Sequence, residues 1–169
     1  QGQERPVEGD QHITFMRQYR GKGANGRIVH FQAGPDFDAV VGDASHAYGE
    51  RLLRFHRHVA FLKPDVFLAL DDLEAPEPVV FEWLAHSYGE IEIAGRDVHI
   101  RKSKAGLLMR CLWPVDAAWR LERTPPDTNG ERLLKHLALR PAEKATSVRF
   151  LVALFVSPLD GAGLPVEVE

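Results

Sequence analysis

The stretch of sequence that decides the fold is residues 37–86, FDAVVGDASHAYGERLLRFHRHVAFLKPDVFLALDDLEAPEPVVFEWLAH. It contains two apolar runs, 52–62 and 66–70, separated by the tight-turn sequence Lys63-Pro64-Asp65. Taken alone, the first run fits a strand or a helix, because its apolar side chains recur at both spacings. The second run is too short for a helix, so the turn between the two runs predicts a β-hairpin.

Short segments in which apolar and polar side chains alternate continue on both sides of this hairpin. Such alternation is typical of a half-buried strand, whose successive side chains point to opposite faces. Residues 147–156 are apolar on both faces, which predicts a strand in the centre of a sheet. Besides the hairpin, we expect strands at 12–19, 27–32, 37–41, 79–86, 90–94, 97–101, 107–113, 119–123, 133–139 and 147–156.

Turn-forming residues separate these segments. The sequence Ala94-Gly95-Arg96 predicts a second hairpin, the proline-containing stretch 74–78 is expected to divide two strands, and 125–130 predicts an exposed loop. No segment predicts a helix with comparable strength. About ten short strands with turns between them predict an all-β fold, an antiparallel β-sandwich, with a barrel or jelly roll as the alternative.

Length and composition point to one ordinary globular domain covering residues 1–169. The hydrophobic fraction is 44%, the charged fraction is 27% and the net charge is −3. This balance does not suggest a disordered chain or a nucleic-acid partner, and no apolar run is long enough to span a membrane. The single cysteine, Cys111, excludes an intrachain disulfide and is expected to be a buried apolar residue. The polar start of the chain carries no export signal and predicts a piece of a longer protein.

Ordered short motifs run through the first ninety residues. They are Gln1-Gly2-Gln3, Gly26-Arg27-Ile28, Gly42-Asp43-Ala44-Ser45 followed by Ala47-Tyr48, the segment RHVAFLKP at 57–64, Asp71-Asp72-Leu73, and Trp83-Leu84-Ala85-His86. In this order and spacing they resemble the C-terminal β-sheet region of heparinase II/III-like polysaccharide lyases. The remaining residues lack such motifs but have the strand-rich pattern that the family would have.

The resemblance implies a two-part enzyme that cleaves acidic, uronate-containing polysaccharides by β-elimination. In this family a helical toroid precedes the β-sandwich. The partners of this chain would therefore be that toroid, in the same protein, and an acidic polysaccharide bound between the two parts. The chemistry needs a neutralised uronate carboxylate, a Tyr or His base and a proton donor for the leaving oxygen. The family's histidine-rich segment and its H-N-T motif, with a metal such as zinc, would lie before Gln1. The resemblance therefore implies a periplasmic or secreted lyase whose isolated C-terminal part is inactive.

Candidate catalytic groups within the chain are Asp43, His46, Tyr48 and His86. The first three are close in sequence, and a carboxylate, an imidazole and a phenol together can form a base with its orienting partner. The alternative is that Asp43 and Ser45 are turn formers that bond to nearby backbone, with Tyr48 packed at a rim. For His86, the alternative is a hydrogen-bonded histidine at a strand end.

Histidines and arginines give two further candidate sites. His56 and His58 lie two residues apart, so both project from one face and can chelate a metal if a third ligand such as His30 or His86 lies nearby. A partly solvated polar sheet face is the alternative. Arginines at positions 54 and 57 can bind a uronate carboxylate, with Arg57 the candidate substrate-binding residue. They can instead pair with acidic residues on neighbouring strands, which we favour, at Asp71, Asp72 and Glu82.

The three tryptophans suggest a function of another class, a non-catalytic carbohydrate-binding module. Sugar rings stack on exposed aromatic faces, and Trp119, beside Arg120, is expected at the surface as a substrate-binding residue. Trp83 alternates with apolar residues and is expected in the core. A purely structural role, in which the sandwich supports a helical domain, is the third possibility.

Overall fold

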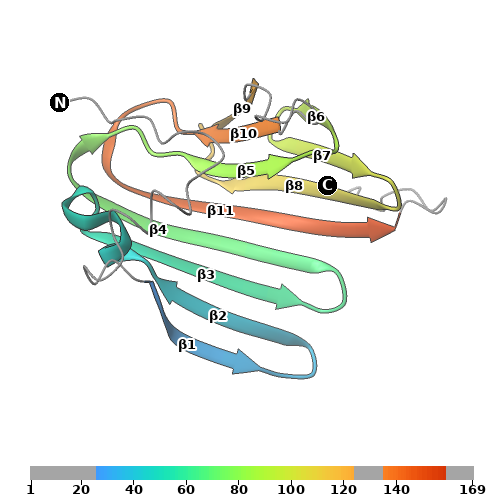
Figure 1. Cartoon of the computed structure of the whole chain (residues 1–169), viewed down its shortest axis with the longest axis horizontal. Coiled ribbons are helices and arrows are strands. Elements are labelled where there is room, and N and C mark those ends of the chain that lie inside the picture. The colour runs from blue at the N-terminus through green and yellow to red at the C-terminus, as the bar shows by residue number, and fades with distance from the viewer. Residues whose placement is uncertain (1–25, 124–134, 159–169) are drawn as a thin grey trace, which may run out of the picture.

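The computed structural model describes residues 26–123 and 135–158, which form two antiparallel β-sheets (Figure 1). The predicted strand at 12–19 and the predicted loop at 125–130 lie outside these residues. The smaller sheet has the order β5-β10-β9. Its strands are β5 (Trp83–Ser87), β10 (Lys135–Arg140) and β9 (Ala118–Arg123).

The larger sheet has eight strands in the order β1-β2-β3-β4-β11-β8-β7-β6. Its two 14-residue strands, β4 and β11, pair with each other near the middle, which confirms the prediction that 147–156 lies in a central strand. The bounds are β1 (Arg27–Ala33), β2 (Phe37–Asp43), β3 (Arg54–Leu62), β4 (Val66–Val79), β6 (Glu90–Ala94), β7 (Asp97–Lys102), β8 (Ala105–Trp113) and β11 (Ala145–Pro158).

Both predicted hairpins are present. β3 and β4 pair in continuous register across the turn at 63–65, and β6 pairs with β7 across Gly95, whose φ of 61° is the left-handed conformation that favours glycine at a tight turn. The two open sheets confirm the predicted all-β sandwich and not its barrel alternative.

Two expectations about secondary structure are wrong. The stretch 74–78 does not end a strand, because β4 continues through it to Val79 opposite the equally long β11. Pro76 and Pro78 cannot donate to the ladder, and the pairing shifts between Ala145 and Ser147 at this point. A short 3-10 helix, η1 (Ser45–Arg51), also connects β2 to β3, where no helix was expected.

The core lies between the facing sides of the two sheets. The larger sheet contributes Phe150, Val152, Met109 and Cys111, and the smaller sheet contributes apolar residues that alternate along its strands, namely Trp83, Leu137, Leu139 and Trp119. Cys111 is buried as predicted, and Trp83 is in the core as predicted.

Trp119 corrects a prediction. Its side chain is only 6% exposed, so the expectation of a surface tryptophan is wrong. The indole packs edge-on against Trp83 at 5.8 Å, and its Nε1 donates to the carbonyl of Arg96 at 3.0 Å. The physical reason is that β9 joins the smaller sheet, so its alternate side chains face the larger sheet.

The smaller sheet covers only part of the larger one. Figure 1 shows β5, β9 and β10 over the part of the larger sheet that contains β8 and β11, while β1, β2 and β3 extend beyond them. In agreement, every residue of β1 is exposed. Across the described residues, no helix has both the length and the apolar character needed to cross a membrane.

Candidate functional site

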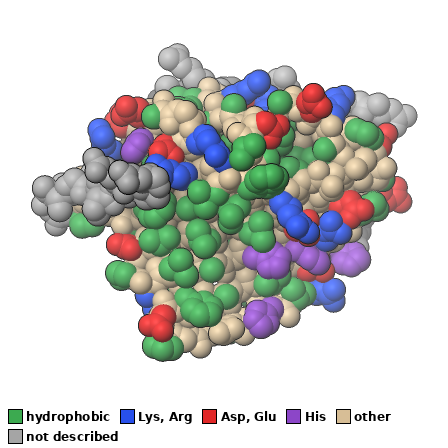
Figure 2. Space-filling model, turned by 180° about the vertical axis from the view of Figure 1, so that it is seen from behind, with side chains coloured by type: hydrophobic (Ala, Val, Ile, Leu, Met, Phe, Trp, Pro, Cys, Tyr) green, Lys and Arg blue, Asp and Glu red, His purple; other side chains and the backbone are tan. Residues whose placement is uncertain are grey.

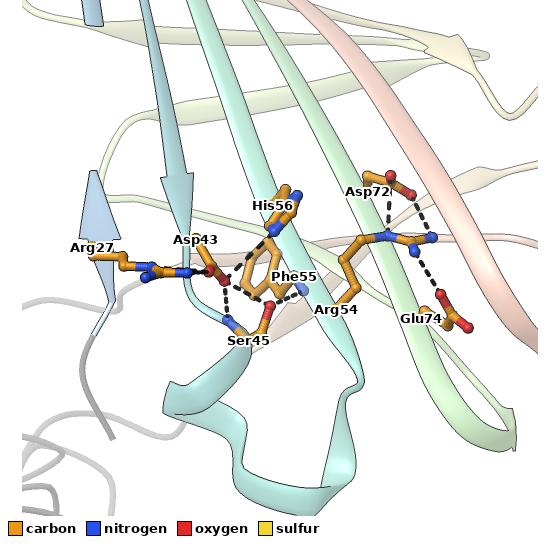
Figure 3. A network of polar contacts seen from close by, with 8 residues as sticks. All are labelled: Arg27, Asp43, Ser45, Arg54, Phe55, His56, Asp72 and Glu74. Carbon is orange, nitrogen blue, oxygen red and sulfur yellow. Dashed lines mark hydrogen bonds and ion pairs between the residues drawn. The ribbon is translucent and has the colours of Figure 1, made fainter. Parts of the chain in front are cut away.

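Asp43, at the end of β2, is the centre of a network of hydrogen bonds (Figure 3). Its Oδ1 accepts from the Ser45 hydroxyl at 2.7 Å and from the Ser45 backbone N–H at 3.0 Å. Its Oδ2 accepts from Arg27 Nε at 3.2 Å and Nη2 at 3.1 Å. The Ser45 hydroxyl in turn accepts from the Phe55 backbone N–H at 2.9 Å. The network ties β1, β2 and β3 to the start of η1.

These contacts determine what Asp43 can do chemically. The Ser45 hydroxyl, then the Ser45 backbone N–H and Arg27, hold the pKa of this buried carboxyl well below its usual range. A carboxylate with such a low pKa and such saturated oxygens is a poor proton acceptor. The geometry therefore favours the turn-forming alternative for Asp43 and Ser45 over a catalytic base.

The side chains in register with Asp43 form a row of alternating charge across the face of the larger sheet that points away from the smaller one. We call this face the outer face. His56 lies between two carboxylates, with its Nε2 3.7 Å from Asp43 Oδ1, and Arg149 Nε lies 3.5 Å from Asp72 Oδ1. The row runs through neighbouring strands as Arg27, Asp43, His56, Asp72 and Arg149.

Arg54 extends this charged region. Its guanidinium lies 3.1 Å from Asp72 Oδ2 and 2.6 Å from Glu74 Oε2. Figure 2 shows the outer face, where histidines gather at one side next to basic and acidic side chains and hydrophobic side chains cover much of the rest. This arrangement agrees with a solvated polar end of a sheet.

The histidines proposed as metal ligands are not all brought together. His56 and His58 project from the outer face, and His30 shares a row with His58 through Val41. His86 instead lies on β5 in the other sheet. Among residues 26–123 and 135–158, no three or more His, Cys, Asp or Glu side chains are arranged to hold a metal ion.

Arg57 lies on the opposite face, against the core. Its Nε and Nη2 donate to the two oxygens of Asp71, each at 2.6 Å, and Asp71 is only 2% exposed. The guanidinium carbon lies 5.6 Å from the ring centre of Phe55 and 6.0 Å from that of Trp83. The hydrogen bond to Asp71 raises the pKa of Arg57. The favoured pairings of Arg57 with Asp71, and of Arg54 with Asp72, are confirmed.

The expectation that Glu82 joins these pairs is wrong. Glu82 lies in the connection between β4 and β5, where it pairs with Arg140 of β10. Arg140 also donates to Glu122 Oε1 of β9 at 2.8 Å, so this arginine of the central strand pairs with an acidic residue on each side of it.

Tyr48, one of the catalytic candidates, lies against the same phenylalanine as Arg57. Its ring centre is 5.3 Å from that of Phe55, the same ring that Arg57 contacts, and its side chain is 48% exposed. Arg57 keeps 45% of its side chain exposed despite the pairing with Asp71. His46 is exposed on η1, two residues before Tyr48. The structure thus places a phenol and a guanidinium around one aromatic ring at the start of β3.

His86 has a partner that sequence reasoning missed. It lies in register with His136 of β10, with ring centres 4.4 Å apart and ring planes at 37°. Burial, followed by the neighbouring His136, lowers the pKa of His86. The two alternating segments 79–86 and 133–139 were both predicted as strands, but only their pairing, which no local pattern reveals, brings the two histidines together.

Comparison with known proteins finds similarity in structure only. No family model matches the chain, and no curated protein is significantly similar to it. The heparan sulfate lyase HepC from Pedobacter heparinus matches with a TM-score of 0.66 and 13% identity, covering 82% of this chain and 22% of that one. Two structures of heparinase III match with TM-scores of 0.65 and 0.59, at 12% and 14% identity, covering 79% and 82% of this chain.

These similarities confirm the fold that the sequence motifs suggested. The chain spans 22% of the length of each of these three lyase structures, so it is similar to one part of them. At such low identity the comparison shows the arrangement of strands and does not transfer any functional residue.

Proposed function

We propose that this chain is the C-terminal β-sandwich module of a heparinase II/III-like polysaccharide lyase. The observation that carries the proposal is that three heparinase or heparan sulfate lyase structures share this fold over about four fifths of the chain. The ordered motifs at 26–28, 42–48, 57–64 and 83–86 support the same family independently of the fold. The longer protein would cleave an uronate-containing acidic polysaccharide by β-elimination in the periplasm or outside the cell.

The main catalytic groups of such a lyase would belong to an upstream helical domain. Elimination needs a cation or hydrogen-bond donors at the uronate carboxylate, a base for the adjacent proton and an acid for the leaving oxygen. In this chain Asp43 is saturated by hydrogen bonds, and two donors of Arg57 are occupied by Asp71. Tyr48 and the exposed part of Arg57 lie around one ring and can face a substrate. We assign them a supporting role at one wall of the cleft.

The zinc that the family resemblance implies is not used in this proposal. Residues 26–123 and 135–158 do not offer a site with three or more suitable ligands, so the described part of the chain does not fit a resident catalytic zinc. The residues here would instead position the sandwich against the domain that precedes it.

The test is an absorbance assay for the unsaturated uronate product. The isolated chain and the same chain joined to its upstream sequence are each incubated with heparin, heparan sulfate and alginate. The proposal predicts product from the joined protein with at least one of these substrates and none from the isolated chain. Turnover by the isolated chain would show that the catalytic groups lie within it.

A non-catalytic carbohydrate-binding role is the second candidate, and one observation favours it. Trp113, at the end of β8, is 52% exposed, whereas the predicted binding residue Trp119 is buried. An exposed indole is a suitable stacking surface for a sugar ring. Retention of the isolated chain on an immobilised polysaccharide, lost in Trp113→Ala, would support this role. Equal elution of both proteins in the flow-through would reject it.

A further inference from the structure

The face of the smaller sheet that points away from the core carries an unusual pair of side chains. Trp83, Ala85, Leu137 and Leu139 contribute to the core, so the residues that alternate with them point outward. On this outward side, His86 of β5 lies directly opposite His136 of β10. Glu122 of β9 lies opposite His136 on its other side.

The two imidazoles are close enough to share one ion. Directly opposite residues in an antiparallel pair have Cβ atoms about 4.5–5.5 Å apart. The ring centres here are 4.4 Å apart, and the planes are tilted by 37°, so the rings are neither stacked flat nor turned away from each other. A metal ion binds the in-plane lone pair of an imidazole nitrogen at about 2.0–2.1 Å, so one ion at a shared edge of the two rings can contact both after side-chain rotation.

A second observation comes from a buried nitrogen of His136. The Nε2 of His136 is buried and has no hydrogen-bond partner among the described residues. A buried polar nitrogen without a partner is uncommon in folded proteins, and a metal ion or a water held there would satisfy it.

The charged side chains beside the two histidines decide whether a third protein ligand is available for a metal ion. Glu122 is the acidic side chain in the row, but Arg140 Nη2 donates to its Oε1 at 2.8 Å. Arg120 lies two residues before Glu122, on the same face of β9. Oε1 of Glu122 is therefore occupied, and no group of three or more suitable ligands is found among the described residues, so we count the two histidines as ligands and Glu122 as a nearby negative charge.

We propose that His86 and His136 form a two-histidine site for a late divalent transition metal such as Cu²⁺ or Zn²⁺. Imidazole is a preferred ligand for these ions, and water molecules would complete the coordination. With only two protein ligands the site binds its metal exchangeably, unlike a closed structural zinc site. The site stands on the geometry of β5 and β10 and does not depend on the lyase proposal.

The test is a titration of Cu²⁺ into the 169-residue chain, followed by calorimetry and by electron paramagnetic resonance. We expect one ion per chain and hyperfine coupling from two imidazole nitrogens. His86→Ala should weaken binding by about tenfold or more, since even changes outside the ligand set cost this much at metal sites. Because His86 is exposed, this variant should keep the fold, which circular dichroism checks.

Control variants make the result decisive. His58→Ala removes a histidine from the other sheet and should leave the affinity unchanged, while His136→Gln should lower it as His86→Ala does. Lowering the pH from about 7.5 to about 5.5 should also weaken binding, because protons compete for the imidazoles. Unchanged affinity in His86→Ala, or an equal loss in His58→Ala, would overturn the proposal.

Discussion

At the scale of single residues, several groups that look reactive in the sequence are used to hold strands together. Asp43 accepts four hydrogen bonds from two residues, Arg27 of β1 and Ser45 of η1, and Asp71 is buried under the guanidinium of Arg57. The sequence revealed that these carboxylates lie near arginines and turn residues. It did not reveal which bonds they make, because those depend on strand register.

The Arg57 and Asp71 pair gives a direct test of this structural role. Removing only the guanidinium in Arg57→Met leaves a buried carboxylate without its partner, which we expect to destabilise the fold by about 2–4 kcal/mol. This is below the full cost of a deeply buried pair because Arg57 is 45% exposed. Chemical denaturation measures the loss.

The matched control is the double variant Arg57→Met with Asp71→Leu. Replacing both partners by apolar side chains leaves no unpaired charge, so the double variant should be more stable than Arg57→Met alone. If the two variants were equally unstable, the lost stability would come from packing around Phe55 and Trp83 and not from the unpaired carboxylate of Asp71.

The depressed pKa of Asp43 should make the folding stability depend on pH. Its pKa in the folded chain is depressed below the usual value of 3.8, so it contributes stability above that pH and loses it as the pH falls further. The melting temperature of the wild type should therefore fall more steeply below about pH 4 than that of Asp43→Asn. Asp36→Asn, at an exposed position, should follow the wild type. Parallel curves for all three proteins would contradict the role of Asp43.

At the scale of secondary-structure elements, sequence patterns predicted most strands but not how long they are or which sheet they join. Alternating side chains located β6 and β7, because a strand has a period of two, whereas the turn at 63–65 decided that β3 is a strand. The proline-containing end of β4 was missed since its partner β11 lies far away in sequence. The 3-10 helix η1 is too short to leave a periodic signal.

Substitutions of Trp119 and Trp113 test which side chains face the core and which face the solvent. Trp119→Ala removes a buried indole and its hydrogen bond to Arg96, and we expect a loss of about 3–5 kcal/mol. Trp113→Ala removes a half-exposed side chain, and the expected loss is below about 1 kcal/mol. Thermal and chemical unfolding of the two variants measure both losses. Similar losses of stability in the two variants would contradict the burial of Trp119 between β9 and the larger sheet.

At the scale of the whole molecule, the two sheets differ in size, and the larger one extends beyond the smaller through β1, β2 and β3 (Figure 1). The all-β sandwich was predictable from the number of short strands and the turns between them. The candidate site was predictable only in part, since Tyr48 and Arg57 do meet around Phe55 whereas His86 lies on the other sheet. Closeness in sequence does not reveal which of these residues meet in the fold and which lie on different sheets.

The central claim is that this sandwich is a required module of a larger polysaccharide lyase. The measurement that tests it most directly is the rate of unsaturated uronate formation by the joined protein with and without residues 26–158. The account predicts that the joined protein forms product and that removal of these residues abolishes turnover. An upstream region that forms product at the same rate without them, or a joined protein that forms none from any uronate polysaccharide, would contradict it.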